Sequence, residues 1–292
     1  MAPEAVPPEA ASTDTVSPGA VSSGAGSPGA GSSGAGSPGA GPTPISGCVI
    51  AFQEEDRIAD CVRSLAFCTE VVVVDSGSTD RTRVLAEQLG ARVLVNAPFP
   101  GHREQKQFAV EAARNDWVLC LDADERVTPE LRSRLQALAA TGLQGGAYEM
   151  PRRNHYLGRV VRRGLFWPDR KIRLFDRRRA RWGGTNPHDR VEVQDGAVTR
   201  LEEAIEHLSY RDLRHHLRTI DSFTRIAARA MRAQGRRASV LDLLLRPPAV
   251  VVKSLVLKRG FLDGWRGLVI AGLSGYYDWL KYRRLRQEWK RP

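Results

Sequence analysis

Four short apolar segments follow one another along the first half of the chain, each separated from the next by about one helix length of amphipathic sequence. Their apolar residues are continuous rather than alternating, which is typical of strands that are buried on both faces. A spacing of roughly 23 residues leaves room for a crossover helix between successive strands. We therefore predict an α/β fold with a mostly parallel, Rossmann-like central sheet. The segments are CVIAF (48–52), VVVVD (71–75), RVLVN (92–96) and WVLCLD (117–122).

The repeating pattern stops after about residue 145. Two further strands are expected at AYEMPRR (147–153) and KIRLFDR (171–177), and NPHDRVEV (186–193) indicates a turn that leads into a short strand. A long helix is expected from Leu213 to Gln234. The pair Pro247-Pro248 should break the chain between that helix and the C-terminal segment.

The first 45 residues have a different composition. SPGA, SSGAG and SPGAG recur there at a five-residue step with almost no large apolar side chain. Such a segment cannot offset its ordering entropy by burial, so we expect a flexible tail.

The formal net charge is +11, and the tail contributes three acids and no base, so the remainder of the chain carries +14. A surface this basic favours an anionic partner. Nucleic acid, acidic lipid headgroups and a phosphorylated substrate all qualify by charge.

Ligands of open parallel sheets bind at the carboxyl ends of the strands, and the expected strand ends here are polar. Helix capping accounts for Asp80 and Thr128, with Pro129 at the first helical position and Glu130 favoured by the helix dipole. Capping does not account for Asp122 and Asp124, which would repel each other unless a cation or an array of donors lies between them. The strand ends are Gln53-Glu54-Glu55, Asp75 to Asp80, Asn96 and Asp122-Ala123-Asp124-Glu125.

A D-x-D pair at a strand end suits a hard divalent cation. Mg²⁺ and Mn²⁺ take carboxylate oxygens and share their remaining positions with water and phosphate oxygens. The sequence contains neither a P-loop nor a G-x-G-x-x-G motif as a competing way to bind phosphate.

These stretches resemble the nucleotide-binding half of family 2 glycosyltransferases, which have the GT-A fold. The resemblance rests on CVIAFQEED, VVVVDSGSTDRT and WVLCLDADE. Later stretches are similar to lipopolysaccharide-core glucosyltransferases and their relatives, so that the resemblance covers about residues 47 to 282. Those later stretches are QKQFAVEAA, KIRLFDRR, NPHDRVEV and LLLRPPAVVVKSLVLKRGFLDGWRGLVIA.

The resemblance implies roles for particular residues. Ala51, Phe52 and Glu54 match the first-strand loop that lines the nucleoside pocket, and Asp75 matches an aspartate that contacts the base or ribose. Asp122 and Asp124 match the acidic motif, whose second carboxylate binds Mg²⁺ or Mn²⁺ while the first faces the sugar or ribose. Glu125 either extends that motif or is an acid that leads into the helix. The general base would be Asp189, with Glu192 or Asp169 as fallbacks.

The chain departs from the family pattern at two points. The first-strand motif T-x-N-E-E is Ala51-Phe52-Gln53-Glu54-Glu55 here, and relatives usually have His-Glu where this chain has His188-Asp189. His188 and His207 could each complete a metal site, contact diphosphate or be structural. The basic cluster Arg152, Arg153, Arg162, Arg163, Arg170 and Lys171 could be solvated surface or meet diphosphate or an anionic acceptor, with Lys106 a further candidate.

The implied activity is that of an inverting glycosyltransferase, for which a UDP-sugar is the expected donor and a glycan or lipid-linked molecule the acceptor, in lipopolysaccharide or other cell-envelope glycan synthesis. The corresponding organisation is a tail (1–45), a GT-A catalytic domain (46–210) and a helical, basic-amphipathic C-terminal region (211–292). The catalytic domain divides into a nucleotide-sugar-binding half (46–145) and an acceptor-side half (146–210).

The C-terminal segment alternates apolar stretches with basic residues. From Pro247 onward it contains ten basic residues against three acids, together with the aromatic residues Trp265, Tyr276, Tyr277, Trp279 and Trp289. This pattern is typical of helices in the headgroup region of an anionic membrane, although helices packed on the catalytic domain or at a dimer interface would also fit. The four cysteines form no C-x-x-C motif, which favours reduced, mostly buried thiols. We expect a cytoplasmic protein that is peripheral at the inner face of the cell membrane.

Two other classes of function remain open from the residues. A nucleotidyltransferase that makes nucleotide sugars would need a glycine-rich basic loop after the first strand, and FQEEDR does not supply one. A non-enzymatic protein that binds nucleic acid or membrane would explain the basic surface but not the acids at the strand ends. No nucleic-acid partner is therefore expected.

Overall fold

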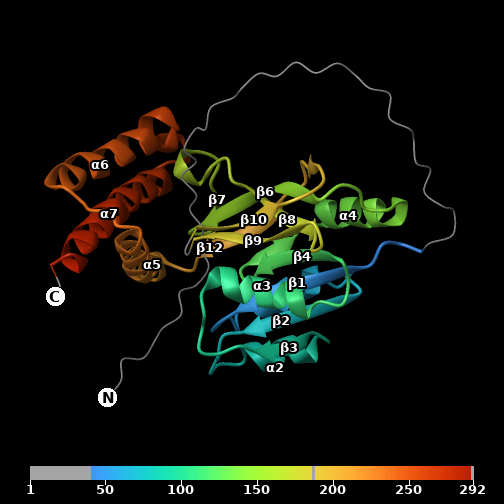
Figure 1. The fold of residues 1–292 in the computed structure, drawn as a ribbon. Helices are drawn as coiled ribbons and strands as arrows, with labels where there is room; N and C mark the ends of the chain where they lie inside the picture. The colour runs from blue at the N-terminus through green and yellow to red at the C-terminus, as the bar shows by residue number, and fades with distance from the viewer. Residues whose placement is uncertain (1–40, 186–187, 291–292) are drawn as a thin grey trace.

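The computed structural model describes residues 41–290 except 186 and 187, and these residues form a mixed α/β fold (Figure 1). The four predicted strands are present and parallel, in the order β3-β2-β1-β4. This confirms the predicted α/β class. Most of the expected N-terminal tail lies outside the described residues. The strands are β1 (Ile45–Ala51), β2 (Glu70–Asp75), β3 (Arg92–Val95) and β4 (Trp117–Asp122), and the helices between them are α1 (Ile58–Ser64), α2 (Thr82–Gln88) and α3 (His102–Ala112).

The second half of the domain extends the same sheet. β8 (Arg170–Asp176) lies antiparallel between β4 and β6 (Ala147–Tyr156), and β12 (Ile205–Tyr210) follows β6 in parallel. β5 (Glu125–Val127) closes the order by pairing antiparallel with β12. The expected strands in β6, β8 and β10 are confirmed, whereas no sequence pattern predicted β5 or β12. The remaining elements here are α4 (Pro129–Thr141), β7 (Arg159–Val160), the 3₁₀ turn η1 (Gly164–Phe166), β9 (Ala180–Thr185), β10 (His188–Val193) and β11 (Val198–Arg200).

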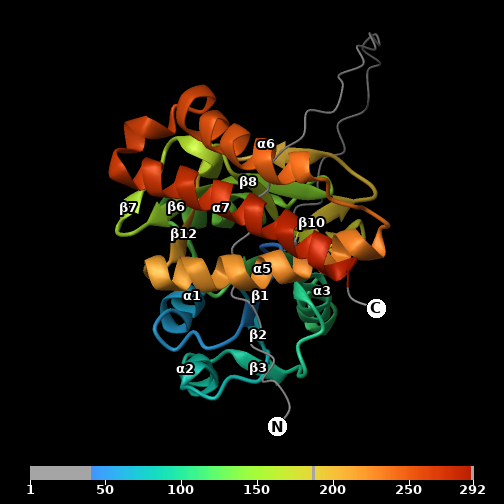
Figure 2. The same ribbon diagram turned by 90° about the vertical axis from the view of Figure 1, so that its left-hand side faces the viewer.

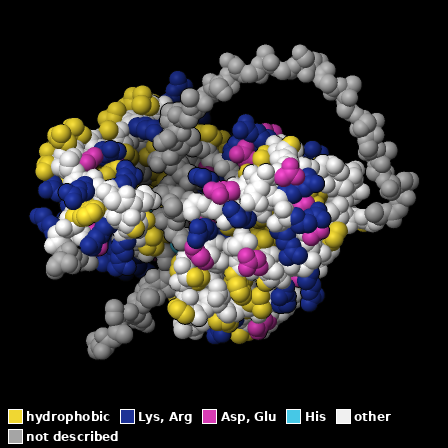
Figure 3. All heavy atoms as spheres, viewed as in Figure 1, with side chains coloured by type: hydrophobic (Ala, Val, Ile, Leu, Met, Phe, Trp, Pro, Cys, Tyr) yellow, Lys and Arg dark blue, Asp and Glu magenta, His cyan; other side chains and the backbone are white. Residues whose placement is uncertain are grey.

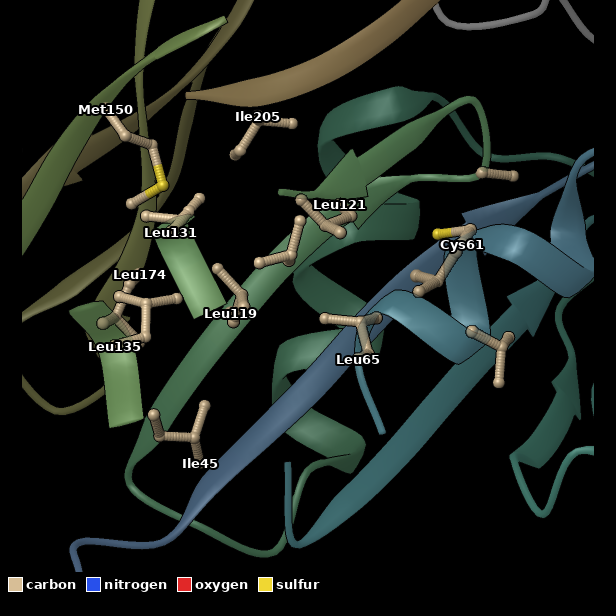
Figure 4. Packing of buried hydrophobic residues seen from close by; sticks show 14 of the residues in the cluster. Ile45, Cys61, Leu65, Leu119, Leu121, Leu131, Leu135, Met150, Leu174 and Ile205 are labelled. Atoms are coloured by element: carbon tan, nitrogen blue, oxygen red, sulfur yellow. The ribbon is translucent and has the colours of Figure 1, made fainter. Parts of the chain in front are cut away.

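Both faces of β1 and β4 and of the second half of β2 are buried, as the continuous apolar runs predicted, whereas the edge strand β3 is only partly buried. In β4, Leu119 and Leu121 face one cluster while Val118 and Cys120 face the other. The first cluster packs against α1, α2 and α4, and Figure 4 shows Leu131 of α4 beside the strand residues. The second cluster packs against α3 and the β9–β10 hairpin. This layering holds the carboxyl ends of the strands in fixed positions.

Helix α4 begins as the sequence indicates. Thr128 is its N-cap and accepts a hydrogen bond from the Leu131 N–H at 3.1 Å, and Pro129 occupies the first helical position. The N-cap of α2 is Arg81, one residue after the expected N-cap at Asp80. The Asp80 carboxylate still accepts from the Thr82 N–H at 3.0 Å, so it satisfies a free donor in the first turn.

Three long helices follow the sheet and gather on one side of it, away from α4 (Figures 1 and 2). The predicted long helix is confirmed to within one residue as α5 (Leu213–Ala233). The helix α6 (Val240–Val252) continues into a π-helical turn, η2 (Lys253–Leu257), and a 3₁₀ turn, η3 (Gly260–Asp263), leads into α7 (Trp265–Glu288).

The expected break at Pro247-Pro248 is wrong, because both prolines lie inside α6. Each removes a backbone N–H, which normally ends a helix. Packing against α7 compensates for this loss: a Cβ atom on Gly275 of α7 would lie 3.2 Å from the Pro247 carbonyl oxygen and 2.7 Å from Val251. The absence of a side chain at Gly275 lets the two helices approach closely enough to stabilise α6.

Two smaller clusters attach the helices to the sheet. Tyr156, Tyr210 and Phe223 pack together with residues of η1 and α7, and Met231 of α5 packs against Tyr282 of α7. All four cysteines are free, and three of them are buried, as expected. Among the described residues, the helices are either too short or too polar to cross a membrane.

Candidate functional site

The carboxyl ends of β1, β2 and β4 meet at one edge of the sheet. In the sheet register, Ala51 of β1 pairs with Asp75 of β2, and Ile50 pairs with Asp122 of β4. Both acids are buried. The strand-end carboxylates indicated by the sequence therefore flank the end of β1.

The loop after β1 is tied to the loop after β2. The Gln53 N–H donates to Oγ of Ser78 at 2.9 Å, and the Glu54 N–H donates to Oγ1 of Thr82 at 2.8 Å. Gln53 has a φ of 56°, a left-handed conformation that asparagine adopts more readily than glutamine. The family pattern has asparagine at the position of Gln53. The left-handed backbone conformation at this position explains the preference for asparagine. Phe52, the neighbour of Gln53, is half-buried in the same loop.

Asp75 and Glu54 both have partners within the protein. One carboxylate oxygen of Asp75 accepts from the N–H groups of Gly77 and Ser78, at 3.0 and 2.7 Å, and the other accepts from the Ser78 hydroxyl. Oε2 of Glu54 lies 2.9 Å from Nη2 of Arg211, at the start of the helical region. Asp75 thus shapes the turn after β2, and Glu54 fixes the first-strand loop to the chain that enters α5.

The acidic motif lies in a buried network of ion pairs. Asp122 has Nζ of Lys106 3.0 Å from Oδ1 and Nη2 of Arg173 2.8 Å from Oδ2. Glu125 is fully buried, and its Oε1 lies 3.0 Å from Nη1 of Arg152 and 2.6 Å from Nη2 of Arg173. Its Oε2 accepts from the Asp122 N–H at 3.1 Å. Glu125 therefore connects the acidic motif to Arg152 of β6 and Arg173 of β8.

The pKa values in this network follow from burial and the cations together. Burial raises the pKa of the Asp122 carboxyl, but Lys106 and then Arg173 outweigh it, so the pKa lies well below its usual range. Burial also raises the pKa of Glu125, which Arg173 and Arg152 bring below its usual value. Both groups are consequently ionised at neutral pH.

Asp124 and His207 form a second pair at this edge. His207 lies on β12, and the backbone N–H of Leu208 donates to the Asp124 carbonyl at 2.9 Å. Nε2 of His207 lies 3.3 Å from Oδ2 of Asp124. Within residues 41–185 and 188–290, neither His207 Nε2 nor Asp124 Oδ1 has a hydrogen-bond partner, although both atoms are buried. Buried polar atoms of this kind call for a ligand.

The neighbours of His207 determine which ring nitrogen carries the proton. The amide nitrogen of Asn154 donates to the Phe166 carbonyl at 2.9 Å and to Asp169 at 3.1 Å, so its Oδ1 atom faces His207 Nδ1 as an acceptor. Nδ1 therefore carries a hydrogen, and Nε2 is the ring nitrogen that faces Asp124. A hydrogen bond that fixes the tautomer in this way is typical of histidines that bind metal.

Asp124 and His207 fit a divalent cation. Two ligands at right angles around a cation with bonds of about 2.1 Å lie about 3 Å apart, close to the separation observed here. No cluster of three or more His, Cys, Asp or Glu suited to a metal occurs in the described part of the chain. Two protein ligands leave most positions for phosphate oxygens and water, which is how Mg²⁺ binds in phosphate-processing sites.

Asp189 lies next to this network. It is on β10, and its Oδ2 is 2.9 Å from Nζ of Lys106, the ammonium group that also contacts Asp122. Burial raises the pKa of Asp189, and Lys106 lowers it further than burial raises it, so the net pKa is below the usual value. The Lys106 ammonium also lies over the indole ring of Trp182, 4.7 Å from its centre. Lys106 thus links the predicted base to the acidic motif.

The other sequence candidates are placed as follows. The side chain of His188 lies outside the described residues. Asp169 is paired with Arg152 at 2.7 Å, and Glu192 is paired with Arg190 at 3.1 Å. Asp169 therefore meets the network through Arg152 and Glu125, whereas Asp189 meets it through Lys106, the cation that also contacts Asp122.

Sequence reasoning missed several residues of the site. Arg173 and Asn154 were not singled out, and Arg152, grouped with the basic surface, is buried between Glu125 and Asp169. A signal existed for Arg173: it lies between Ile172 and Leu174 in an expected strand, and a cation in a buried strand needs a carboxylate. For Asn154 there was no comparable signal.

Comparisons with known proteins point to one family. The model of Glycosyl transferase family 2 matches residues 46–202. An uncharacterized glycosyltransferase of Rickettsia felis is 30% identical over 259 residues, which cover 83% of this chain and 89% of that protein. The lipopolysaccharide core biosynthesis glycosyltransferase LpsC of Rhizobium meliloti is 27% identical over 240 residues, or 80% of this chain and 86% of LpsC.

A solved structure is also similar over part of the chain. It is glucosyl-3-phosphoglycerate synthase from Mycobacterium tuberculosis in complex with Mn²⁺, UDP and glucosyl-3-phosphoglycerate, with 27% identity and a TM-score of 0.32. The match covers 39% of this chain and 44% of that one, which is less than half of either.

Proposed function

The chain belongs to glycosyl transferase family 2, and from that premise we propose that it transfers a sugar, with inversion, from a UDP-sugar to a glycan or lipid-linked acceptor. The observation that carries the proposal is the Asp124–His207 pair at the sheet edge, beside the Asp189–Lys106–Asp122 network. The similarity to LpsC supports lipopolysaccharide or another cell-envelope glycan as the product.

Asp124 and His207 would hold Mg²⁺ or Mn²⁺. When bound, the ion would neutralise negative charge that develops on the departing nucleoside diphosphate. Asn154 supports this arrangement, because its hydrogen bond fixes the His207 ring with Nε2 toward Asp124. Arg57 approaches the same carboxylate, with Nη1 3.9 Å from Oδ2 of Asp124. It would add positive charge on the diphosphate side of the site.

Asp189 would act as the general base. In the displacement, the acceptor oxygen forms a bond to the anomeric carbon while the bond from that carbon to the diphosphate oxygen breaks. The hydroxyl proton of the acceptor moves to the Asp189 carboxylate. Lys106 keeps Asp189 ionised at neutral pH, so the base is ready to accept a proton before the acceptor arrives. Lys106 also orients this carboxylate toward the first aspartate of the acidic motif, Asp122.

We place the acceptor in the cavity of about 200 Å³ that adjoins Asp189. Its wall contains more cations than carboxylates, and two of its residues, Arg173 and Trp182, carry a buried N–H that lacks a hydrogen-bond partner among the described residues. An acceptor that bears a phosphate or carboxylate group fits this wall better than a neutral sugar. The charged and aromatic lining consists of Lys106, Glu149, Arg170, Lys171, Arg173, Trp182, Asp189 and Arg190.

We further propose that the enzyme works at the cytoplasmic face of the cell membrane as a peripheral protein. A lipid-linked acceptor would be presented at such a surface. The basic, apolar-rich C-terminal region supports this location.

Thermal unfolding with nucleotides tests the donor and the metal together. We expect UDP to raise the unfolding temperature in the presence of Mn²⁺ and to have little effect in EDTA. Asp124 and His207 provide too few ligands to hold Mn²⁺ without the diphosphate, so the ion and UDP should bind together. GDP, CDP and dTDP in parallel identify the base. Hydrolysis of a panel of UDP-sugars then identifies the sugar. If no nucleotide shifts unfolding and the protein instead binds DNA or RNA tightly, the glycosyltransferase proposal fails.

A further inference from the structure

The surface formed by α6, η2, η3 and the start of α7 is unusually apolar. None of the residues of α6 is buried in the described structure, although most of them are apolar. Leu241, Leu244 and Leu257 are 63%, 62% and 74% exposed. We call this surface the C-terminal apolar face. Its large exposed residues are Val240, Leu241, Leu244, Leu245, Val252, Val256, Leu257, Phe261, Leu262, Trp265 and Leu268.

These residues form a continuous stripe. Leu241, Leu244, Leu245, Pro248, Val252 and Val256 follow one another at steps of one to four residues, so they share one side of α6 and its π-helical continuation. In Figure 3, hydrophobic side chains gather at the upper left, over the region that Figure 1 labels α6. An exposed apolar patch of this extent on a folded protein marks an interaction site.

Cations border the C-terminal apolar face. Lys258 and Arg259 are exposed between η2 and η3, and Arg162 and Arg163 are exposed on the adjoining loop. Asp263 is the nearby acid, and its carboxylate accepts from the backbone N–H groups of Arg162 and Arg163, at 3.1 and 2.8 Å. That contact holds the loop against η3 while both arginine side chains remain exposed, with Nη1 of Arg163 donating to the Arg162 carbonyl at 3.2 Å.

A basic cavity lies where the cations and the apolar side chains meet. Its volume is about 500 Å³, and it is lined by three arginines and one acid, together with Leu262 and Trp265 of the C-terminal apolar face; the charged residues are Arg159, Arg162, Arg266 and Asp263. The Asp263 carboxylate already accepts from the backbone N–H groups of Arg162 and Arg163, so the arginines outnumber it in the cavity. The guanidinium of Arg266 is fixed by two hydrogen bonds to the Leu157 carbonyl, at 3.1 and 2.9 Å. A phosphate group in this cavity would meet arginine side chains while apolar groups attached to it met Leu262 and Trp265.

We infer that the C-terminal apolar face and the adjoining basic cavity dock on an anionic lipid bilayer, with the phosphate of a lipid headgroup in the cavity. Apolar side chains would enter the boundary between headgroups and acyl chains, as amphipathic helices do in an interface. The positive border selects a negatively charged surface. At 13 residues α6 is too short to span a bilayer, so it lies along the surface. This inference does not depend on the proposed glycosyl transfer.

Co-sedimentation with vesicles tests the inference. Vesicles of phosphatidylcholine with phosphatidylglycerol should bind the full chain, and vesicles of phosphatidylcholine alone should bind it much less. The double variant Arg159→Gln, Arg162→Gln should weaken binding to the anionic vesicles about fivefold per guanidinium. Leu244→Ser and Leu257→Ser should each weaken it on the order of tenfold or more.

Matched controls lie on the opposite side of the molecule. Arg134→Gln on α4 and Val84→Ser on α2 remove an exposed cation and an exposed apolar side chain far from the C-terminal apolar face, and should bind vesicles as the unaltered chain does. Circular dichroism and UDP-dependent protection show whether each variant is folded. If the leucine variants misfold, the arginine pair still provides the test.

Two results would overturn the inference. Equal binding to both kinds of vesicle, unaffected by the arginine variants, excludes recognition of an anionic surface. Absence of vesicle binding, together with a dimer in sedimentation velocity that Leu244→Ser converts to monomer, would show that a second copy covers this face. Failure of the proposed function would appear separately, as the absence of any nucleotide effect in a protein that still binds anionic vesicles.

Discussion

Nε2 of His207 lies 3.3 Å from Oδ2 of Asp124, although Asp124 is in the turn between β4 and β5 and His207 is on β12, more than 80 residues later in the sequence. β12 brings them together because it pairs with β5, in the register that aligns His207 with Glu125. The acidic motif therefore has beside it the imidazole nitrogen of a residue far along the chain.

Replacing His207 by glutamine should remove the Mn²⁺-dependent part of UDP protection. In the proposed site the imidazole would be one of two protein ligands. Loss of a group that only supports a ligand costs about 10–100-fold in metal affinity, so loss of the imidazole should weaken Mn²⁺ binding by at least that much. Electron paramagnetic resonance of free Mn²⁺ measures this affinity directly. Asn154→Leu should weaken Mn²⁺ binding by about 10–100-fold, because the ring orientation is then no longer fixed. The half-buried His155, which pairs with Glu206, provides the control: His155→Gln should leave Mn²⁺ affinity unchanged.

Replacing Asp189 by asparagine should lower kcat by roughly 10²–10⁴-fold, the usual contribution of a general base. Protection by UDP and Mn²⁺ should persist, since Asp189 does not belong to the Asp124–His207 pair. The control is Asp195→Asn, because that carboxylate is 77% exposed and lies in the loop after the same hairpin. A fully active Asp189→Asn variant would assign the base elsewhere.

Lys106 should control the pH range of the base. It lowers the pKa of Asp189 against the opposing effect of burial, so Lys106→Met should raise that pKa. Activity requires the ionised carboxylate, and the fall in kcat/KM on acidification should therefore begin at a higher pH in the variant. A pH–rate profile measures the displacement, with Lys290→Met as an exposed control. An unchanged acid limb would show that Asp189 does not titrate in the rate profile.

Glu125→Gln should destabilise the fold. The substitution leaves Arg152 and Arg173 buried with one carboxylate fewer, and breaking a buried ion pair costs about 3–5 kcal/mol. Urea unfolding measures this loss. Glu130→Gln, at the exposed start of α4, removes a favourable helix-dipole interaction and should cost at most about 1 kcal/mol. Equal effects of the two substitutions would contradict the structural role of Glu125.

His216 should make stability depend on pH below neutrality. Burial lowers its pKa from the ordinary value of 6.5 to about 3, and it is hydrogen-bonded to the Tyr156 hydroxyl at 2.9 Å. Since the folded pKa is below the unfolded one, the stabilisation is fully present above pH 6.5 and decreases as the pH falls toward 3. His216→Asn should flatten the pH dependence of the free energy of unfolding in that range. Urea titrations at several pH values provide the measurement, and an identical slope in the variant would exclude His216 as the source.

The sequence determined the frame of the protein. Continuous apolar runs separated by helix-length segments favoured buried strands, so the parallel sheet and the position of Asp75 and Asp122 at its carboxyl edge followed from pattern and spacing. The D-x-D pair could be recognised because no capping role explains two acids, one residue apart, at the end of a buried strand. The cap at Thr128 and the extent of α5 followed from local preferences.

The tertiary structure decided which residues meet those acids. Arg152, Arg173 and His207 reach the acidic motif through pairings of β6, β8 and β12 that join distant segments, and no local pattern encodes such pairings. The same holds for Pro247 and Pro248, whose local preference to end a helix is overridden by packing of α6 against Gly275 of α7. Local preferences amount to a few kcal/mol at most, and contacts between distant elements can exceed them.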